Sequence, residues 1–142
     1  MTRRRQAREL AMKLLYQNDI ASGEPDETLQ QLAAWAPSSA PQEVREFALD
    51  LVRIVLGHRA EIDDRIAAAS EHWRIGRMSA VDRNIVRLAT AEILHLEDIP
   101  PKVSINEAVD LAKKYGDEDS ARFVNGVLDR VYGQPDSEES DC

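Results

Sequence analysis

KVSINEAVDLAKKYGDEDSARFVNGVLDR, residues 102–130, is the stretch of sequence that decides the fold. Its pattern predicts two amphipathic helices separated by a break at residues 115–117. The apolar stripes of the two helices are Ile105, Ala108, Val109 and Ala112, and then Val124, Val127, Leu128 and Val131. Packing on a core accounts for these stripes. It does not account for a mixed polar and aromatic set made of Lys113, Lys114, Asp119, Phe123, Asn125 and Gly126.

The ends of these two helices carry capping signals. Ser104, with Glu107 three residues later, fits a capping box, in which two side chains satisfy two of the free amides that open a helix. Gly116 is suited to the left-handed conformation that often ends a helix. Asp117 is then placed to cap the helix that follows.

The helix that precedes this stretch is predicted to be central. Ser79 and Asp82 form another capping signature, and the helix they open extends to about Leu96. Apolar residues cover much of its circumference, which is typical of a helix surrounded by others. Pro100 and Pro101 follow and stop the helix.

The amino-terminal half reads as four further helices before a connector. We expect them at about residues 3–20, 26–36, 41–56 and 59–69, with the connector at residues 70–79. The predicted fold class is therefore all-α, with about seven helices that form two helical subdomains of one compact domain. The domain spans residues 1–134, with halves at about 1–70 and 79–134, and residues 135–142 form an acidic, disordered tail.

Composition favours a soluble, helical protein of the cytoplasm. The 142 residues are 43% hydrophobic and 31% charged. The sequence contains no apolar run of the roughly 20 residues that a membrane helix needs, and no apolar signal core follows the charged start. Cys142 is the only cysteine, which excludes a disulfide framework and indicates a reducing compartment.

The net charge of −8 is unevenly distributed. Four acidic residues lie between Asp136 and Asp141, so half of the net charge belongs to the predicted tail. The first 13 residues instead contain five cations, Arg3, Arg4, Arg5, Arg8 and Lys13, against the single acid Glu9. A local basic patch of this kind can attract phosphate even on an acidic protein.

Catalytic and cofactor motifs are absent from the sequence. No glycine-rich phosphate loop occurs, and neither a GxSxG nor a Cys/His nucleophile pair is present. His58, His72 and His95 lack metal-ligand spacing, so we expect them at the surface or at the junction of the halves. We therefore predict no enzymatic activity, no cofactor and no metal site.

Three segments of the chain resemble one known family. They are RRRQARELAMKLLYQ (residues 3–17), VDRNIVRLATAEIL (81–94) and PPKVSINEAVDLAKKYGDEDSARFVNGVLD (100–129). All three are similar to the NusB family of bacterial transcription antitermination factors. The resemblance implies a heterodimer with the ribosomal protein NusE. It also implies that the pair binds boxA RNA and joins NusA and NusG on RNA polymerase, which suppresses termination during ribosomal RNA transcription.

The resemblance also assigns candidate RNA-binding residues. They are Arg3, Arg4, Arg5 and Arg8 in the first helix, and Phe123 and Asn125 in the last. Arginines pair with phosphates, aromatic rings stack on unpaired bases, and amides bond base edges. The alternatives are a solvated helix start for the arginines and core packing for Phe123. For Gly126 we expect close helix packing.

Candidate partner-binding residues follow from the same resemblance. The resemblance implies that NusE binds at Tyr16 and at the segment VDRNIVR, where Asp82 matches an acidic position of the family that contacts NusE. Asp82 can equally be only the acid of the capping box. Arg83 and Arg87 are one helical turn apart, and we expect them on the exposed side of their helix, at the edge of the interface.

Two rival functions remain open. One is a helical protein–protein adaptor without direct RNA contact. The other is a stand-alone relative of the RNA-binding module of ribosomal RNA methyltransferases, although a catalytic domain would then have to follow and the chain ends at Cys142. The sequence also leaves open whether the chain is a monomer or a homodimer.

Overall fold

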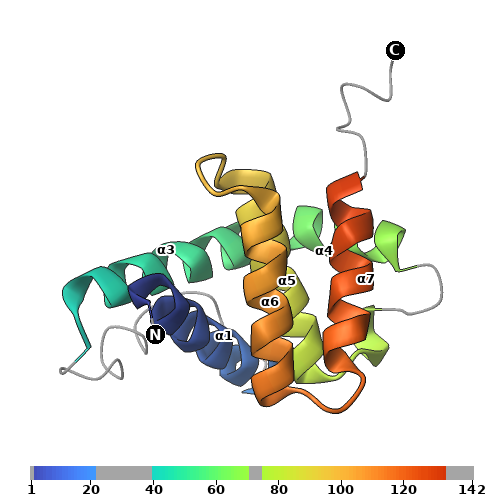
Figure 1. Cartoon of the computed structure of the whole chain (residues 1–142), viewed down its shortest axis with the longest axis horizontal. Helices are drawn as coiled ribbons and strands as arrows, with labels where there is room; N and C mark the ends of the chain where they lie inside the picture. The colour runs from blue at the N-terminus through green and yellow to red at the C-terminus, as the bar shows by residue number, and fades with distance from the viewer. Residues whose placement is uncertain (1, 22–39, 71–74, 134–142) are drawn as a thin grey trace.

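The computed structural model of the chain describes residues 2–21, 40–70 and 75–133. These residues form six α-helices, one short 3-10 helix and no strand, which confirms the predicted all-α class (Figure 1). The helices are α1 (Arg3–Ala21), α3 (Gln42–Gly57), α4 (Arg59–Ala69), η1 (Ile75–Arg77), α5 (Ala80–His95), α6 (Pro101–Tyr115) and α7 (Ser120–Gly133). The helix expected at residues 26–36 and the tail at 135–142 lie outside the described residues. In the part of the chain that is described, no helix is long and apolar enough to cross a membrane.

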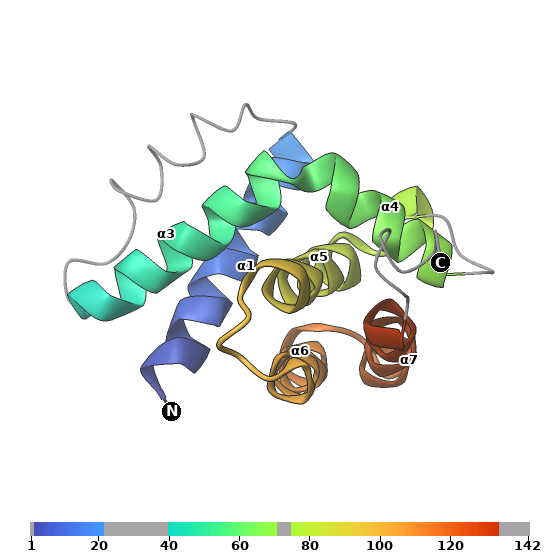
Figure 2. The same ribbon diagram turned by 90° about the horizontal axis from the view of Figure 1, so that it is seen from above.

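Helix α5 is central, as predicted. It contacts α1, α3, α4, α6 and α7, and these helices surround it in the view from above (Figure 2). Its side chains from Asn84 to Glu92 are buried without interruption. The helix begins where the sequence predicts, because the Ser79 hydroxyl accepts a hydrogen bond of 3.1 Å from the Asp82 amide.

Two helix pairs enclose this centre. Helix α1 packs against α3 on one side, and α6 packs against α7 on the other (Figures 1 and 2). The predicted stripes of α6 and α7 point inward, and Ala112, Val124 and Leu128 are fully buried. On α4, Ile62 and Ile66 are also fully buried. Burial of such side chains contributes roughly 1.5–3 kcal/mol each.

The capping box predicted at Ser104 is wrong. Helix α6 begins at Pro101, because a proline is well accommodated in the first turn, where its missing amide hydrogen costs nothing. Ser104 therefore lies inside the helix, where it is buried and donates a hydrogen bond of 2.9 Å to the Glu92 carboxylate. The acid of the predicted box, Glu107, binds Arg5 instead.

The left-handed conformation predicted for Gly116 is also wrong. Its φ is −89° and its ψ is −172°, which is extended backbone. A glycine is required here for space, because an added Cβ would lie 2.5 Å from Ser120 Cβ and 2.8 Å from the Ala112 carbonyl oxygen. Asp117, which the sequence places as the cap of α7, lies three residues before the helix begins at Ser120, and its carboxylate accepts hydrogen bonds from the Asp119 amide and the Ser120 hydroxyl in the turn between α6 and α7.

Candidate functional site

Arg3 and Arg4 are the exposed cations at the start of α1. The Arg3 guanidinium lies 3.0 Å from the Glu43 carboxylate, and that of Arg4 lies 4.0 Å from Asp98. Arg4 also stacks over the Phe47 ring, 4.8 Å from its centroid. Both arginine side chains are more than half exposed. Exposed ion pairs of this kind contribute only about 0–1 kcal/mol, so a phosphate can replace either carboxylate at little cost.

Arg5 connects α1 to α6. Its guanidinium donates hydrogen bonds of 2.8 Å to Glu107 and 3.0 Å to Asp110. The hydrogen bond with Glu107 is the main reason that the pKa of Arg5 is raised. Its side chain is 40% exposed, so Arg5 is reachable from solvent but already has two carboxylate partners.

Arg8 belongs to the interior, unlike the three arginines before it. It is only 3% exposed, and its guanidinium binds the buried carboxylate of Glu92 through two hydrogen bonds of 2.8 and 2.9 Å. The face of α1 that carries Arg8 also carries Ala7 and Ala11, and it is turned toward the core. The expectation that Arg8 is available to RNA therefore does not agree with its burial, and its partner is a carboxylate on α5.

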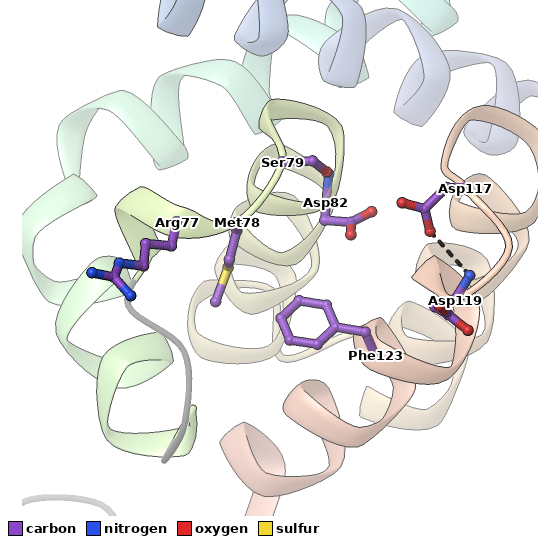
Figure 3. Close-up of a pocket in the computed structure, with 7 residues that line it drawn as sticks. All are labelled: Arg77, Met78, Ser79, Asp82, Asp117, Asp119 and Phe123. Atoms are coloured by element: carbon purple, nitrogen blue, oxygen red, sulfur yellow. Dashed lines mark hydrogen bonds between the residues drawn. The ribbon is translucent and has the colours of Figure 1, made fainter.

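A pocket of about 270 Å³ lies beside the start of α5 (Figure 3). It is lined by Arg77, Met78, Ser79, Asp82, Asp117, Asp119 and Phe123. Figure 3 shows the ring of Phe123 pointing toward Met78 and the carboxylate of Asp82 pointing toward the other two aspartates. The pocket thus combines two apolar side chains with three acidic ones and the single cation Arg77, so its net charge suits a cationic or hydrogen-bond-donating group.

Asp82 is the residue of this pocket with unsatisfied hydrogen-bonding capacity. It is 8% exposed, and its Oδ1 atom is buried without a hydrogen-bond partner in the described part of the chain. Its amide, but not this oxygen, takes part in the cap with Ser79. A buried polar atom without a partner costs about 1–3 kcal/mol, so a donor in the pocket would recover this free energy once the Asp82 side chain rotated Oδ1 toward it.

A second hollow, of about 340 Å³, also reaches the first turn of α5, at Val81. It is lined by Met12, Lys13, Tyr16, Gln17, Val81 and Tyr115. The Lys13 ammonium lies 5.4 Å from the centroid of the Tyr115 ring, within the range of a cation–π contact. Tyr16 and Asp82, which the family resemblance assigned to one partner surface, thus line two different hollows, and these hollows reach the adjacent residues Asp82 and Val81.

The predicted exposure of Arg83 and Arg87 is wrong. Their side chains are 15% and 6% exposed, and both bind the Asp19 carboxylate of α1, at 2.7 and 3.4 Å. Arg87 also donates two hydrogen bonds to Asp63 of α4, at 2.8 and 3.0 Å. Because α5 is surrounded by other helices, these arginines point at carboxylates of neighbouring helices and not at solvent.

Asp19 is the shared partner of Arg83, Asn84 and Arg87. Burial raises the pKa of the Asp19 carboxyl, but hydrogen bonds from Arg83 and Asn84 and the charges of Arg83 and Arg87 outweigh burial and lower it. Asp19 thus stays ionised and holds α1 to α5. The role of this acid was missed from the sequence, where it is one of many acids, and no local spacing indicates its partners.

Phe123 and Asn125 lie on α7, apart from the exposed arginines of α1. Phe123 is half-buried at the edge of the core, whereas Asn125 is exposed. Helix α6 lies between α1 and α7 in both views (Figures 1 and 2). The close packing predicted for Gly126 is wrong, because within the described residues no atom beyond the backbone of α7 itself lies within 4 Å of the place its Cβ would occupy.

Comparison with known proteins shows to which family this chain is similar. The NusB family model matches residues 5–133 of the chain. Transcription antitermination protein NusB of Desulforapulum autotrophicum is 48% identical over 128 residues, which cover 90% of each chain. The protein of the same name from Geobacter sulfurreducens is 49% identical over 131 residues, covering 92% of this chain and 94% of that protein.

Solved structures agree with the sequence comparison. The structure of T. maritima NusB superposes with a TM-score of 0.86 at 36% identity, covering 99% of this chain and 97% of that one. A crystal structure of the antitermination factors NusB and NusE in complex with double-stranded RNA matches with a TM-score of 0.80 at 34% identity. That match covers 93% of this chain and 97% of the other.

Proposed function

The chain belongs to the NusB family, and we propose that it acts as a transcription antitermination factor which binds boxA-type RNA together with the ribosomal protein NusE. We assign the protein no catalytic activity and propose that it acts in the cytoplasm. NusA, NusG and RNA polymerase complete the larger complex, in which the protein promotes processive transcription of ribosomal RNA.

The observation that carries the proposal is the unpartnered, buried oxygen of Asp82 in a pocket beside the start of α5. A related NusB is solved with NusE and RNA, so a partner protein is the natural source of the missing donor. We assign the NusE surface to Asp82 and Tyr16, with the two hollows that these residues line. Arg83 and Arg87 support this surface from inside through Asp19.

RNA contact is assigned to the exposed members of the predicted set. Arg3 and Arg4 have the most accessible guanidinium groups of the four arginines, and the partners of both are weakly held surface carboxylates. Arg5 would have to share Glu107 and Asp110 with a phosphate. The Arg8 guanidinium is buried, so we give it a structural role. Phe123 offers a partly exposed ring and Asn125 an exposed amide, both suited to unpaired bases.

Complex formation tests the proposal directly. Purified protein is mixed with NusE and either boxA RNA or a scrambled RNA of equal length, and each mixture is examined by size-exclusion chromatography and gel shift. We expect a complex with NusE, and a ternary complex only with the boxA sequence. Asp82→Lys should abolish NusE binding, while Asp64→Lys, at an exposed acid on α4, should leave it unchanged. Failure to form either complex contradicts the proposal.

A second candidate function has one observation in its favour. Arg3, Arg4 and Arg5 all have carboxylate partners within the fold, so the basic start of α1 is partly neutralised. A protein adaptor without direct RNA contact would need no more than this. The same gel shift separates the two functions, because an adaptor binds NusE but does not increase the affinity of NusE for boxA RNA.

A further inference from the structure

The chain brings two of its histidines together at the junction of three helices. The rings of His58 and His95 are stacked, with centroids 4.1 Å apart and planes inclined by 29°. Glu61 completes the group, since its carboxylate lies 2.8 Å from His95 Nε2. One ligand atom from each of the three residues lies within 4.8 Å of the other two.

Each of these side chains is positioned by a well-defined piece of backbone. His58 is the single residue between α3 and α4, and its amide donates to Ile54 while its carbonyl accepts from Ile62. Glu61 lies in the first turn of α4, and His95 is the last residue of α5. The three side chains therefore start from fixed helix ends, and only their own rotamers are free to adjust.

We propose that His58, Glu61 and His95 form a binding site for a divalent transition metal ion of the Zn²⁺ class. Two imidazoles and one carboxylate match the sets of three protein ligands that bind zinc with a water in the fourth position. Imidazole also suits Cu²⁺ and Ni²⁺, whereas Mg²⁺ and Ca²⁺ prefer oxygen ligands. The donor set thus selects one class of metal.

The geometry requires only local rearrangement. Zinc–nitrogen bonds are about 2.0–2.1 Å long, so the ligand atoms of a tetrahedral site are separated by about 3.3 Å. The present limit of 4.8 Å exceeds this separation, and the two stacked rings must also rotate out of their stack, because an imidazole nitrogen binds a metal in the plane of its own ring. His95 and Glu61 are 24% and 54% exposed, and His58 is exposed, so a hydrated ion can reach the site from solvent.

The metal would connect two parts of the chain that are distant in sequence. His58 and Glu61 belong to the amino-terminal half, and His95 belongs to the carboxyl-terminal half. An ion bound by all three would hold the junction of α3 and α4 to the end of α5. Because it would bind the folded state in preference to the unfolded chain, it would raise the melting temperature.

Isothermal titration of tag-free protein with ZnCl₂ tests the site. All variants carry Cys142→Ser, which removes the one thiol that competes for zinc. We expect one equivalent of Zn²⁺ to bind and to raise the Tm, and MgCl₂ to do neither. His58→Ala, Glu61→Gln and His95→Ala should each weaken zinc binding at least tenfold.

The third histidine supplies the matched control. His72→Ala removes one imidazole from the same chain and should leave the affinity unchanged. Circular dichroism confirms that each variant is folded before titration. Two results would overturn the proposal: absence of saturable zinc binding to the Cys142→Ser protein, or binding that survives the loss of both His58 and His95.

Discussion

The guanidinium of Arg8 and the carboxylate of Glu92 form a buried ion pair that joins α1 to α5. Arg8 Nε donates to Glu92 Oε2 at 2.9 Å, and Arg8 Nη2 donates to Glu92 Oε1 at 2.8 Å. Ser104 adds a third hydrogen bond, to Oε1, from α6. Glu92 is 1% exposed, so three helices meet at one charged group inside the fold.

Removal of one member of this pair should strongly destabilise the folded protein. Glu92→Ala leaves the Arg8 charge buried without its main partner, and such losses typically destabilise a protein by about 3–5 kcal/mol. Arg3→Ala breaks the exposed pair with Glu43 and should cost less than about 1 kcal/mol. Urea unfolding followed by circular dichroism measures both values. Similar losses for the two variants would contradict the buried role of the pair.

Asp19 should make stability depend on pH at the acid end. Its pKa is lowered from an ordinary value of 3.8, so the unfolded chain takes up its proton at a higher pH than the folded chain does. The stabilisation is therefore complete above about pH 5 and is lost as the pH falls through 3.8 and below. Asp19→Asn should lower the free energy of unfolding at pH 7. The difference in this free energy between the variant and the parent protein should be smaller at pH 3.5.

The control for this prediction is Asp50, an exposed carboxylate on α3. It lies 3.9 Å from Arg53 one turn away, and its side chain is 63% exposed. Asp50→Asn should change the urea midpoint little at any pH. If the two variants show the same pH dependence, Asp19 does not hold the arginine cluster as the hydrogen bonds indicate.

Two glycines should respond to alanine in opposite directions. At Gly116 the new methyl group collides with Ser120 and with the Ala112 carbonyl, and overpacking of this kind costs about 1–3 kcal/mol. At Gly126, in the middle of α7, the methyl group meets no atom of another described segment, and alanine is favoured there by about 0.5–1 kcal/mol. Thermal melts of Gly116→Ala and Gly126→Ala should therefore shift down and up. A downward shift of both would show that Gly126 has contacts beyond those described.

The exposed arginines should determine the salt dependence of RNA binding. Each phosphate contact to single-stranded RNA contributes roughly 0.7 to the slope of log affinity against log salt. Substitution of both Arg3 and Arg4 by Gln should therefore reduce the slope by about 1.4, measured with NusE present. Arg53→Gln removes an equally exposed arginine from α3 and should leave the slope unchanged. An unchanged slope for the double variant would mean that neither arginine meets a phosphate.

Local sequence determined the helices of this protein. The apolar stripes of α6 and α7, the Ser79 cap of α5 and the extent of α4 were all predicted correctly, because helical periodicity and caps depend on residues within one or two turns. The central position of α5 was also predictable, since few faces of that helix are polar enough to meet water.

Tertiary structure decided which charged residues are exposed. The sequence of α1 shows four arginines within six positions, and nothing local separates Arg8, which is buried, from Arg4, which is not. The difference arises from Glu92, 84 residues away, which provides a buried carboxylate on α5. Arg87 is withdrawn from solvent by Asp19 and Asp63 in the same manner.

Local sequence also could not reveal that the two histidines meet, or that Asp82 and Phe123 line one pocket. His58 and His95 lie 37 positions apart, and only the packing of α3, α4 and α5 stacks their rings. Asp82 and Phe123 meet at one pocket because α5 and α7 begin at the same end of the molecule (Figures 1 and 3). A pattern within one segment records which face of a helix is apolar. The polar partner of a charged group is chosen by helices that pack together from distant parts of the chain, and this choice is made by the tertiary fold alone.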